Sequence, residues 1–388
     1  MVTVESGAGH PNRGVLLFSA DAAYRLLAYT HQHAAFRLGD GGVLPPYRAQ
    51  FEITYRCNSF CRHCCKQHRP ERLDDLPREL LTAHDWIALA HSLPRFTLIT
   101  LTGGEPLMHP GFAEIIAGIS RSRVMNLLTN ATLLDAEMID LLLRARVVLL
   151  GVPIYGVAER HNAVVCAPNR YEMAVDNLRR LRSRQRARGQ RRPLLDLKTI
   201  VTADNLSEVD HLLELAAELD ADYLTFSLGY DNPVMLNPFL KPDLSHHDFQ
   251  RLHPFGPTDK TVRREFARVF RRLLEQGDAG RTRFRFYPSF PSPDLAEAFF
   301  LEPERFTGRM LPCTCPWGTI VVNPEGQAFP CLSVAVGSVR ERSWRAVWRG
   351  PAFRDFRRTI RAAGALPACW GCCYVSIDFS SFARGEHD

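Results

Sequence analysis

Ten of the eleven cysteines in this chain fall into two groups that lie far apart in the sequence. The first group, near the start, consists of Cys57, Cys61, Cys64 and Cys65. The second group, near the other end, consists of Cys313, Cys315, Cys331, Cys369, Cys372 and Cys373. Clustered cysteines in a chain without an export signal indicate metal ligands or catalytic thiols before they indicate disulfides. The remaining cysteine, Cys166, stands alone and is expected to be a small buried apolar residue.

Cys57, Cys61 and Cys64 form a C-x3-C-x2-C run directly after a strand-like segment. Three thiolates so close together on a loop can bind one corner of an iron–sulfur cube, which four cysteines would saturate. Three ligands leave one iron open for a small molecule, as in catalytic metal sites. Cys65 adjoins Cys64 and should point elsewhere, so we do not expect it to be a ligand. The alternative is a structural zinc knot, which usually has a second cysteine pair downstream.

A glycine-rich motif, Thr102-Gly-Gly-Glu-Pro106, follows the next strand-like segment. Two glycines let a backbone approach a ligand closely. The carboxylate of Glu105 can accept hydrogen bonds from a ligand ammonium group. Taken alone, the motif would be interpreted as a plain turn.

The two motifs together closely resemble those of the radical S-adenosylmethionine (radical SAM) enzymes, over residues 49–230. The shared features are the C-x3-C-x2-C run, with an aromatic residue (His63) before its third cysteine, and the Gly-Gly-Glu-Pro motif. The resemblance implies a [4Fe–4S] cluster bound by Cys57, Cys61 and Cys64. The open iron of that cluster would bind the amino and carboxylate groups of S-adenosylmethionine (SAM).

The resemblance also implies which residues hold SAM. The seat for the methionine ammonium would consist of Gly103, Gly104, Glu105 and Pro106. Thr129 and Asn130, which end the third strand-like segment, would contact the methionine or ribose part. The segment from Tyr155 to Tyr171 is similar to one found in members that carry an extra C-terminal cluster domain.

The chemistry implied by this resemblance needs a cofactor, because amino-acid side chains cannot perform it. A reduced cluster would pass one electron to SAM, whose carbon–sulfur bond breaks to give methionine and a 5′-deoxyadenosyl radical. That radical would remove a hydrogen atom from the substrate. The electron would come from a donor such as flavodoxin or ferredoxin. The protein would have to hold the substrate close to the radical and exclude water.

The second cysteine group brackets a predicted hairpin over residues 321–331, which turns at Pro324–Gly326. A cysteine on each side of a hairpin, followed by a C-x2-C pair, is a four-thiolate site. It resembles the auxiliary-cluster domains named SPASM and, in shortened form, twitch. No cysteine follows Cys373, which favours the twitch-like form with one auxiliary [4Fe–4S] cluster.

The expected ligands of the auxiliary cluster are Cys313, Cys331, Cys369 and Cys372. Cys315 or Cys373 could substitute, and zinc is the alternative metal. A fully ligated cluster would relay or accept electrons. A cluster with an open iron would bind the substrate instead.

Strand-like and helix-like segments alternate between the two cysteine groups, which indicates βαβ units and a parallel sheet. The predicted strands are 49–55, 96–102, 124–129, 147–154, 194–201 and 223–228. The predicted helices include 77–92, 136–144, 171–186, 206–219 and 263–276. The expected fold class is α/β: a partial (β/α)6 TIM-like barrel, followed by a small C-terminal α+β cluster-binding domain.

The expected domain boundaries follow from these elements. Residues 1–48 form an N-terminal extension with one helix around Ala20–Ala35, and residues 49–310 form the barrel. Residues 229–259 form a long loop over its active face, and residues 311–388 form the auxiliary-cluster domain.

Three polar features are expected to be structural. The arginine-rich run over residues 178–192 could bind an acidic leader peptide or phosphate, but we favour a solvated helix end. Tyr230, Asp231 and Lys198 could act as proton donors or acceptors, but a structural ion pair explains Lys198 and Asp231 equally well, so we assign them no catalytic role. The histidines of the long loop could bind a metal, but an exposed polar loop is favoured; they are His246, His247 and His253.

Composition excludes several classes of protein. Of the 388 residues, 46% are apolar and 23% are charged, as in ordinary globular proteins. The sequence contains no run of about 18 apolar residues, so no membrane span is predicted. Residues 1–10 lack the layout of a secretory signal, so a cytoplasmic chain is expected. The net charge of +6 is too dilute to indicate nucleic acid.

Three functions follow, in order of preference. The first is a radical SAM enzyme that acts on a ribosomally synthesised precursor peptide in natural-product biosynthesis. Because residues 1–48 look too short for a leader-binding domain, a separate leader-peptide-binding protein would be needed. The second is dehydrogenation, epimerisation or decarboxylation of a sugar or aminocyclitol intermediate. The third is a non-catalytic iron–sulfur or zinc sensor, for which the Gly-Gly-Glu-Pro motif would have no use.

Overall fold

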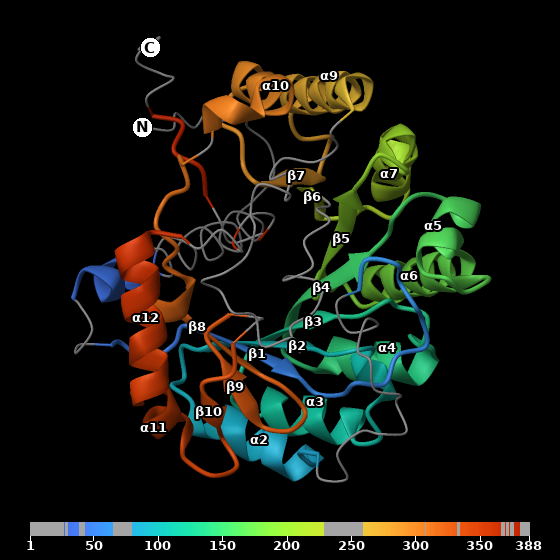
Figure 1. Ribbon diagram of the computed structural model, residues 1–388. Coiled ribbons are helices and arrows are strands. Elements are labelled where there is room, and N and C mark those ends of the chain that lie inside the picture. The colour runs from blue at the N-terminus through green and yellow to red at the C-terminus, as the bar shows by residue number, and fades with distance from the viewer. Residues whose placement is uncertain are drawn as a thin grey trace.

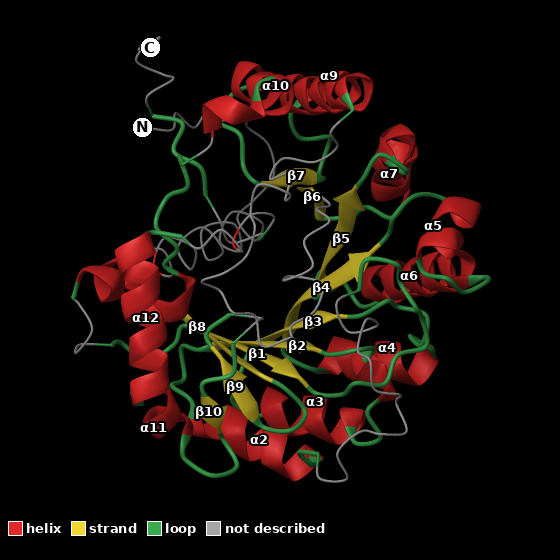
Figure 2. Cartoon of the chain, in the orientation of Figure 1, coloured by secondary structure: helices red, strands yellow, loops and turns green. Residues whose placement is uncertain are grey.

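One ten-stranded sheet runs through the described part of the computed structural model, in the order β10-β9-β8-β1-β2-β3-β4-β5-β6-β7. Seven consecutive strands are parallel, and they are β1 (Arg48–Glu52), β2 (Leu98–Thr102), β3 (Met125–Leu128), β4 (Val147–Pro153), β5 (Leu194–Val201), β6 (Tyr223–Leu228) and β7 (Arg283–Tyr287). The sheet curves, with helices around its outside (Figures 1 and 2). This arrangement is the expected partial TIM-like barrel.

The structure describes residues 27, 30–38, 43–64, 80–228, 259–306, 308–331, 334–365, 369, 372 and 376–380. The expectations for the long loop, apart from its last residue, therefore lie outside the described residues. So do those for Cys65, Cys373 and most of the helix expected around residues 20–35. Within the described residues, no helix has an apolar stretch long enough to cross a bilayer.

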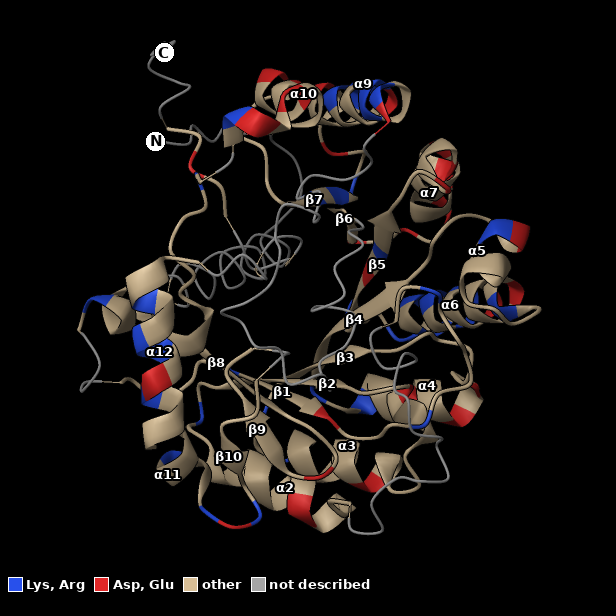
Figure 3. Ribbon diagram, viewed as in Figure 1, with Lys and Arg blue, Asp and Glu red and all other residues tan. Residues whose placement is uncertain are grey.

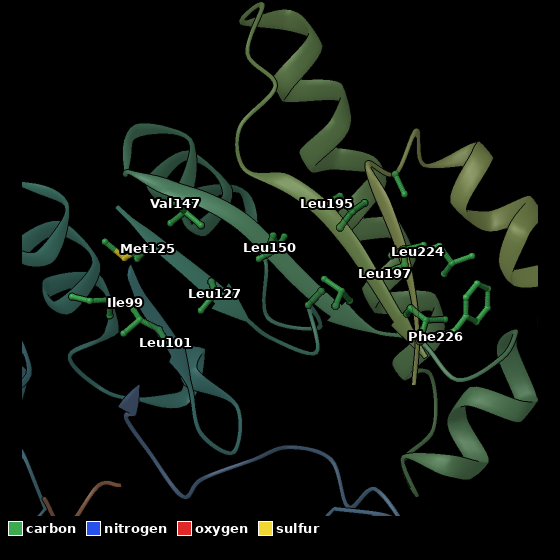
Figure 4. Close-up of a cluster of buried hydrophobic side chains, with 14 of the residues drawn as sticks. Ile99, Leu101, Met125, Leu127, Val147, Leu150, Leu195, Leu197, Leu224 and Phe226 are labelled. Carbon is green, nitrogen blue, oxygen red and sulfur yellow. The ribbon is translucent and has the colours of Figure 1, made fainter. Parts of the chain in front are cut away.

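The helices that cover the sheet and flank its C-terminal edge are α2 (Ala83–Ser92), α3 (Phe112–Ser120), α4 (Ala136–Arg144), α5 (Ala158–Val164), α6 (Arg170–Ala187), α7 (Val209–Glu218), α9 (Lys260–Gln276), α10 (Pro293–Leu301), α11 (Trp344–Trp348) and α12 (Pro351–Ala363). Apolar side chains of the strands alternate with polar ones, because successive residues of a strand point to opposite faces. The apolar set packs toward the helices and forms the core shown in Figure 4. The polar set, which includes Thr100, Asp196 and Thr225, therefore lines the inner face of the sheet.

All six predicted strands are present, and the structure adds β7 as a seventh. Its sequence, Arg-Phe-Arg-Phe-Tyr, alternates strictly, and the aromatic residues stack on the outer face, with the Phe226 and Phe286 rings 5.5 Å apart. That alternation is the signal from which sequence analysis could have found the strand.

The predicted C-terminal hairpin is confirmed. Strand β9 (Gln327–Phe329) pairs antiparallel with β8 (Thr319–Val322), and β10 (Gly337–Ser338) pairs with β9. Strand β8 also pairs in parallel with β1. The C-terminal region thus continues the barrel sheet instead of forming a sheet of its own.

Candidate active site

The loop after β1 carries the first cysteine group at the carboxyl edge of the sheet. Cys57, Cys61 and Cys64 are each partly buried. Burial, together with the neighbouring sulfurs of Cys64 and Cys57, raises the pKa of the Cys61 thiol to about 12. A thiol whose ionisation is disfavoured in this way needs a nearby cationic centre to hold it as a thiolate.

The end of α5 fixes the path of this cysteine loop. The backbone N–H groups of Phe60 and Arg62 donate to the carbonyl oxygens of Val165 and Val164, at 2.9 and 3.0 Å. The last carbonyls of a helix have no partner within the helix itself. The loop satisfies two of them, so the spacing of the cysteines depends on where α5 ends.

The two glycines of the Gly-Gly-Glu-Pro motif lie against the backbone that leads into Cys57. The Gly104 N–H donates to the Thr54 carbonyl at 2.8 Å, and the Glu105 N–H donates to the Arg56 carbonyl at 2.7 Å. A Cβ atom on Gly104 would lie 2.3 Å from the Arg56 oxygen. The close approach that these glycines permit is therefore to the cysteine loop itself.

The Gly104→Ala substitution should displace Arg56 and, with it, the first cysteine ligand. We expect iron loading to fall from about eight to about four atoms per chain, because only the barrel cluster would be lost. The control is Gly189→Ala, where nothing lies within 4 Å of the added Cβ. It should load as wild type does, despite a strain of roughly 1 kcal/mol. Normal loading of Gly104→Ala would contradict the assigned role of this contact.

Glu105 ties β2 to the end of β3. Its buried carboxylate accepts the Thr129 hydroxyl at 2.7 Å, the Asn130 N–H at 2.7 Å and the Leu107 N–H at 3.1 Å. Burial raises its pKa to about 7, and the three hydrogen bonds oppose that rise. The carboxylate that sequence analysis offers to a ligand ammonium is thus already engaged by the protein.

The raised pKa of Glu105 predicts a pH-dependent stability. Between its ordinary pKa of 4.5 and its folded pKa of about 7, the folded chain retains a proton that the unfolded chain has lost. The free energy of unfolding should therefore fall by up to about 3 kcal/mol as the pH rises through this window. Urea unfolding at pH 5 and pH 8 should show this slope in wild type and not in Glu105→Gln.

Other titrating groups contribute equally to wild type and variant, so the difference between their slopes isolates Glu105. Glu114→Gln, which removes an exposed carboxylate from α3, should keep the slope of wild type. If the free energy of unfolding changes equally with pH in Glu105→Gln and in wild type, the Glu105 carboxylate stays ionised between pH 5 and pH 8.

Asn58 connects the cysteine loop to the residues after β3. Its side-chain amide donates to the Thr132 hydroxyl at 2.9 Å and its carbonyl accepts the Asn130 amide at 2.7 Å. Asn177 of α6 then donates to the carbonyls of Ala131 and Thr132, at 2.9 and 3.2 Å. Asn130 therefore acts within the protein. Sequence analysis missed Asn177, although it is a polar residue within the buried stripe of a helix.

An aromatic wall borders the three thiols. The ring of Tyr155 lies edge-on to His63, with centroids 4.5 Å apart, and stacks on His161 at 5.7 Å. Burial and the nearby sulfurs of Cys61, Cys64 and Cys57 raise the Tyr155 pKa well above its ordinary value. Burial lowers the pKa of each of the two histidines to about 4. The wall is thus uncharged at neutral pH and shields the cysteine site from water.

The expectation that Cys166 is buried is wrong. The residue is exposed, because it follows α5 in a left-handed conformation, with φ at 50°, that turns its side chain outward. Its sulfur is near enough to raise the pKa of Cys61. Cys166 is therefore a solvent-facing neighbour of the cysteine loop.

Lys198 forms a structural ion pair, but its partner is Asp196; Asp231, which sequence analysis named beside it, lies outside the described residues. The Lys198 ammonium lies 2.8 Å from the Asp196 carboxylate, which is fully buried. Arg285 approaches the same oxygen at 3.3 Å, and the Thr225 hydroxyl donates to the other oxygen at 2.6 Å. Strands β5, β6 and β7 thus build a charged cluster on the inner face of the sheet, and β5 carries both signs of charge in Figure 3.

The arginine-rich run is held by ion pairs within the protein. Arg182 is buried and lies 2.8 Å from Asp222, while Arg184 and Arg188 both contact Asp140 of α4 at 2.5 and 2.8 Å. These contacts anchor α6 to its neighbours, and Figure 3 shows the basic residues spread along α6. The favoured interpretation of a merely solvated helix end is incomplete, and these arginines already have anionic partners.

The described cysteines of the second group gather beside the start of β8. Burial and the nearby Cys369 raise the pKa of Cys313 to about 11. Cys313, Cys331 and Cys369 pack against a small apolar cluster that includes Trp317. The Cys372 N–H donates to the Cys369 carbonyl at 3.0 Å. The four expected auxiliary ligands therefore lie in one region of the fold.

Cys315 lies in the same region and is the most buried of these thiols. It belongs to the short 3-10 turn η6 (Cys315–Trp317). Burial and the nearby Cys313 raise its pKa well above the ordinary value. It remains an alternative ligand, as the sequence indicates.

The two cysteine groups lie at opposite ends of the β1–β8 pair. Thr319, the first residue of β8, pairs with Arg48, the first residue of β1. Cys315 precedes this point and Cys57 follows the far end of β1. A five-residue strand is roughly 17 Å long at 3.3 Å per residue, so the groups form two separate centres.

The donor sets fit iron–sulfur clusters. In a four-iron cluster each thiolate binds a different iron. The first group offers three thiols on one loop, and the four expected auxiliary ligands lie in one region of the fold. Buried side-chain oxygens of Thr100 and Asn126 on the inner face lack a hydrogen-bond partner among the described residues, as expected where a polar ligand binds.

Comparison with known families supports both centres. The model of the radical SAM superfamily matches residues 51–216. The SPASM model, an iron–sulfur cluster-binding domain, matches residues 313–373. The matches contain the first and second cysteine groups respectively.

Similar proteins extend this result over most of the chain. The AdoMet-dependent heme synthase of Methanosarcina barkeri is 27% identical over 84% of this chain and 88% of its own. The PqqA peptide cyclase of Granulibacter bethesdensis is 21% identical over 85% of this chain and 83% of its own.

The crystal structure of Streptococcus suis SuiB bound to its precursor peptide SuiA shares the fold. Its TM-score is 0.58 at 12% identity, over 92% of this chain and 75% of that one. The motifs, the curved parallel sheet, the two thiol centres and these matches lead to one conclusion: the chain belongs to the radical SAM superfamily, and is a modifying enzyme that uses SAM and [4Fe–4S] clusters and carries a C-terminal SPASM domain.

Proposed function

We propose that this enzyme removes a hydrogen atom from a side chain or α-carbon of a ribosomally synthesised precursor peptide. In this proposal Cys57, Cys61 and Cys64 bind the cluster that holds SAM. When bound, that cofactor pair supplies an organic radical, which the protein alone cannot make. The turns after β2 and β3, from Gly103 to Pro106 and at Thr129 and Asn130, seat SAM. The aromatic wall keeps water out.

The polar inner face of the sheet is the observation that carries the substrate proposal. It offers the partly exposed cations of the Asp196 cluster, Lys198 and Arg285, together with the unpartnered oxygens of Thr100 and Asn126. A peptide backbone and its charged side chains can satisfy such groups, whereas an apolar substrate cannot. The similarity to a protein named PqqA peptide cyclase over 85% of this chain supports the same class.

The auxiliary cluster would relay electrons in this proposal. Its ligands would be Cys313, Cys331, Cys369 and Cys372, with Cys315 as the alternative fourth thiolate. The length of β1 separates this group from the first cysteines, so the second cluster is too far away to share the SAM ligand. A one-electron donor, such as flavodoxin or ferredoxin, and a separate leader-peptide-binding protein complete the proposed system.

Deuterium transfer tests the substrate class. Precursor peptides produced in deuterated medium from short reading frames beside the gene, and a deuterated aminocyclitol, are incubated separately with the reduced, fully loaded enzyme and SAM. We expect deuterium in 5′-deoxyadenosine from a peptide only, and none with the Cys57→Ala/Cys61→Ala/Cys64→Ala variant. Deuterium from the aminocyclitol alone would replace this proposal with the small-molecule alternative. An absence of SAM cleavage despite full loading would favour a sensor.

A further inference from the structure

Arg357 of α12 is a fully buried cation that contacts the η6 turn, which carries Cys315 of the second cysteine group. Its exposed fraction is 0%, and arginine is almost never buried to this extent unless it is paired. Among the described residues no carboxylate pairs with it, and burial lowers its pKa to about 9. A guanidinium in this position needs a negative charge that the described side chains do not supply.

Neutral groups hold the Arg357 guanidinium in place. Its Nε donates to the Pro316 carbonyl and its Nη1 to the Trp348 carbonyl, both at 2.8 Å. The guanidinium also lies over the Trp348 and Phe353 rings, 4.3 and 4.0 Å from their centroids. Nη2 is buried and has no hydrogen-bond partner among the described residues. These contacts fix the cation without neutralising it.

The contact with Pro316 places this charge beside the second cysteine group. Pro316 directly follows Cys315 in the η6 turn. Phe356, which adjoins Arg357 on α12, belongs to the apolar cluster against which Cys313, Cys331 and Cys369 pack. Four thiolates and a four-iron cluster carry a net negative charge, which grows by one when the cluster is reduced.

We propose that Arg357 is the buried counter-charge of the auxiliary cluster and a positioning residue for the η6 turn. A fixed cation stabilises the more negative, reduced form of the cluster, so Arg357 raises its reduction potential. This makes the cluster a better acceptor for the electron left on a substrate after hydrogen removal. The inference rests on the auxiliary cluster and not on the identity of the substrate.

A potentiometric titration tests this inference without any substrate. The barrel cluster is removed by Cys57→Ala/Cys61→Ala/Cys64→Ala, and the one-electron reduction of the auxiliary cluster by dithionite, through mediators, is followed by electron paramagnetic resonance. Arg357→Met should lower the midpoint potential, and Arg357→Lys should stay close to the parent protein. The control is Arg358→Met, because Arg358 lies on the same helix but is exposed and pairs with Asp355 at 3.3 Å.

The proposal is overturned if Arg357→Met leaves the potential unchanged, or if Arg358→Met lowers it as much. Thermal unfolding gives a second readout: loading the cluster should raise the melting temperature less in Arg357→Met than in the parent protein. If Arg357→Met fails to load iron, loading of Arg357→Lys supports the role of the charge. Failure of both variants to load contradicts it, since the guanidinium shape alone would then matter. A peptide that proves not to be the substrate would leave every one of these measurements unaffected.

Discussion

Replacing Cys57, Cys61 and Cys64 together with alanine is expected to lower the iron content from about eight to about four atoms per chain. The same change should abolish the formation of methionine and 5′-deoxyadenosine from SAM. The reason is geometric: the three thiols occupy one loop, while the second group lies at the opposite end of the β1–β8 pair. Iron and sulfide are counted after anaerobic reconstitution, and SAM products after reduction.

Cys166→Ala is the matched control for this experiment. Its sulfur lies near Cys61 but is exposed, 3.6 Å from the Ala163 carbonyl at the end of α5. It should keep the full iron content and full SAM cleavage. A fall from about four irons to none in the triple variant would mean that the second group holds no iron–sulfur cluster. Zinc without iron in both proteins would contradict the assignment of both centres.

The positions of the barrel strands in the sequence could be predicted because each strand carries its own local pattern. Segments such as 194–201 and 223–228 are apolar, have a strand-like length and alternate with amphipathic helices, so local pattern is sufficient. Strand β7 was missed because arginines interrupt its apolar residues, although its period of two is strict. The pairing of β8 with β1 joins residues some 270 positions apart. No local pattern encodes such a contact.

The site could be predicted where its chemistry depends on spacing along the chain. The C-x3-C-x2-C run is a local feature, and the structure keeps its three thiols together on one loop. The role of Gly104 could not be predicted, because its close neighbour is the Arg56 backbone in another strand connection. Glu105 is similar: its partners at Thr129 and Asn130 come from a different strand. Gly104 and Glu105, which the sequence motif suggests as ligand contacts, thus hold the ends of β1, β2 and β3 together.

The burial of Arg357 could not be predicted from the sequence either. Its position in the α12 sequence, between Phe356 and Arg358, gives no indication that it is buried. Only the fold reveals that one arginine of this helix faces the cysteine region while the next faces solvent. Whether a buried cation has a carboxylate partner depends on how the chain packs, so it cannot be inferred from composition.

The Asp196→Asn substitution should lower the free energy of unfolding by about 3 kcal/mol. It removes the only carboxylate that contacts Lys198 and Arg285 among the described residues, and leaves two cations facing each other on the inner face of the sheet. Removing one partner of a buried ion pair lowers the free energy of unfolding by about 3–5 kcal/mol. The lower end applies here because the Lys198 side chain is 34% exposed, so water screens part of the repulsion. Urea unfolding of the loaded enzyme measures the change.

Asp210→Asn provides the matched control, because it removes the same charge from an exposed pair. Asp210 lies 2.7 Å from Arg272 with 61% of its side chain exposed, so the expected loss is below about 1 kcal/mol. Equal losses in the two variants would show that the inner-face cluster is no more buried in solution than a surface pair. If repulsion between the cations causes the loss, adding Lys198→Met to Asp196→Asn should restore part of the stability. If the losses of stability caused by Asp196→Asn and by Lys198→Met simply add in the double variant, the carboxylate acts instead through its hydrogen bond to Thr225.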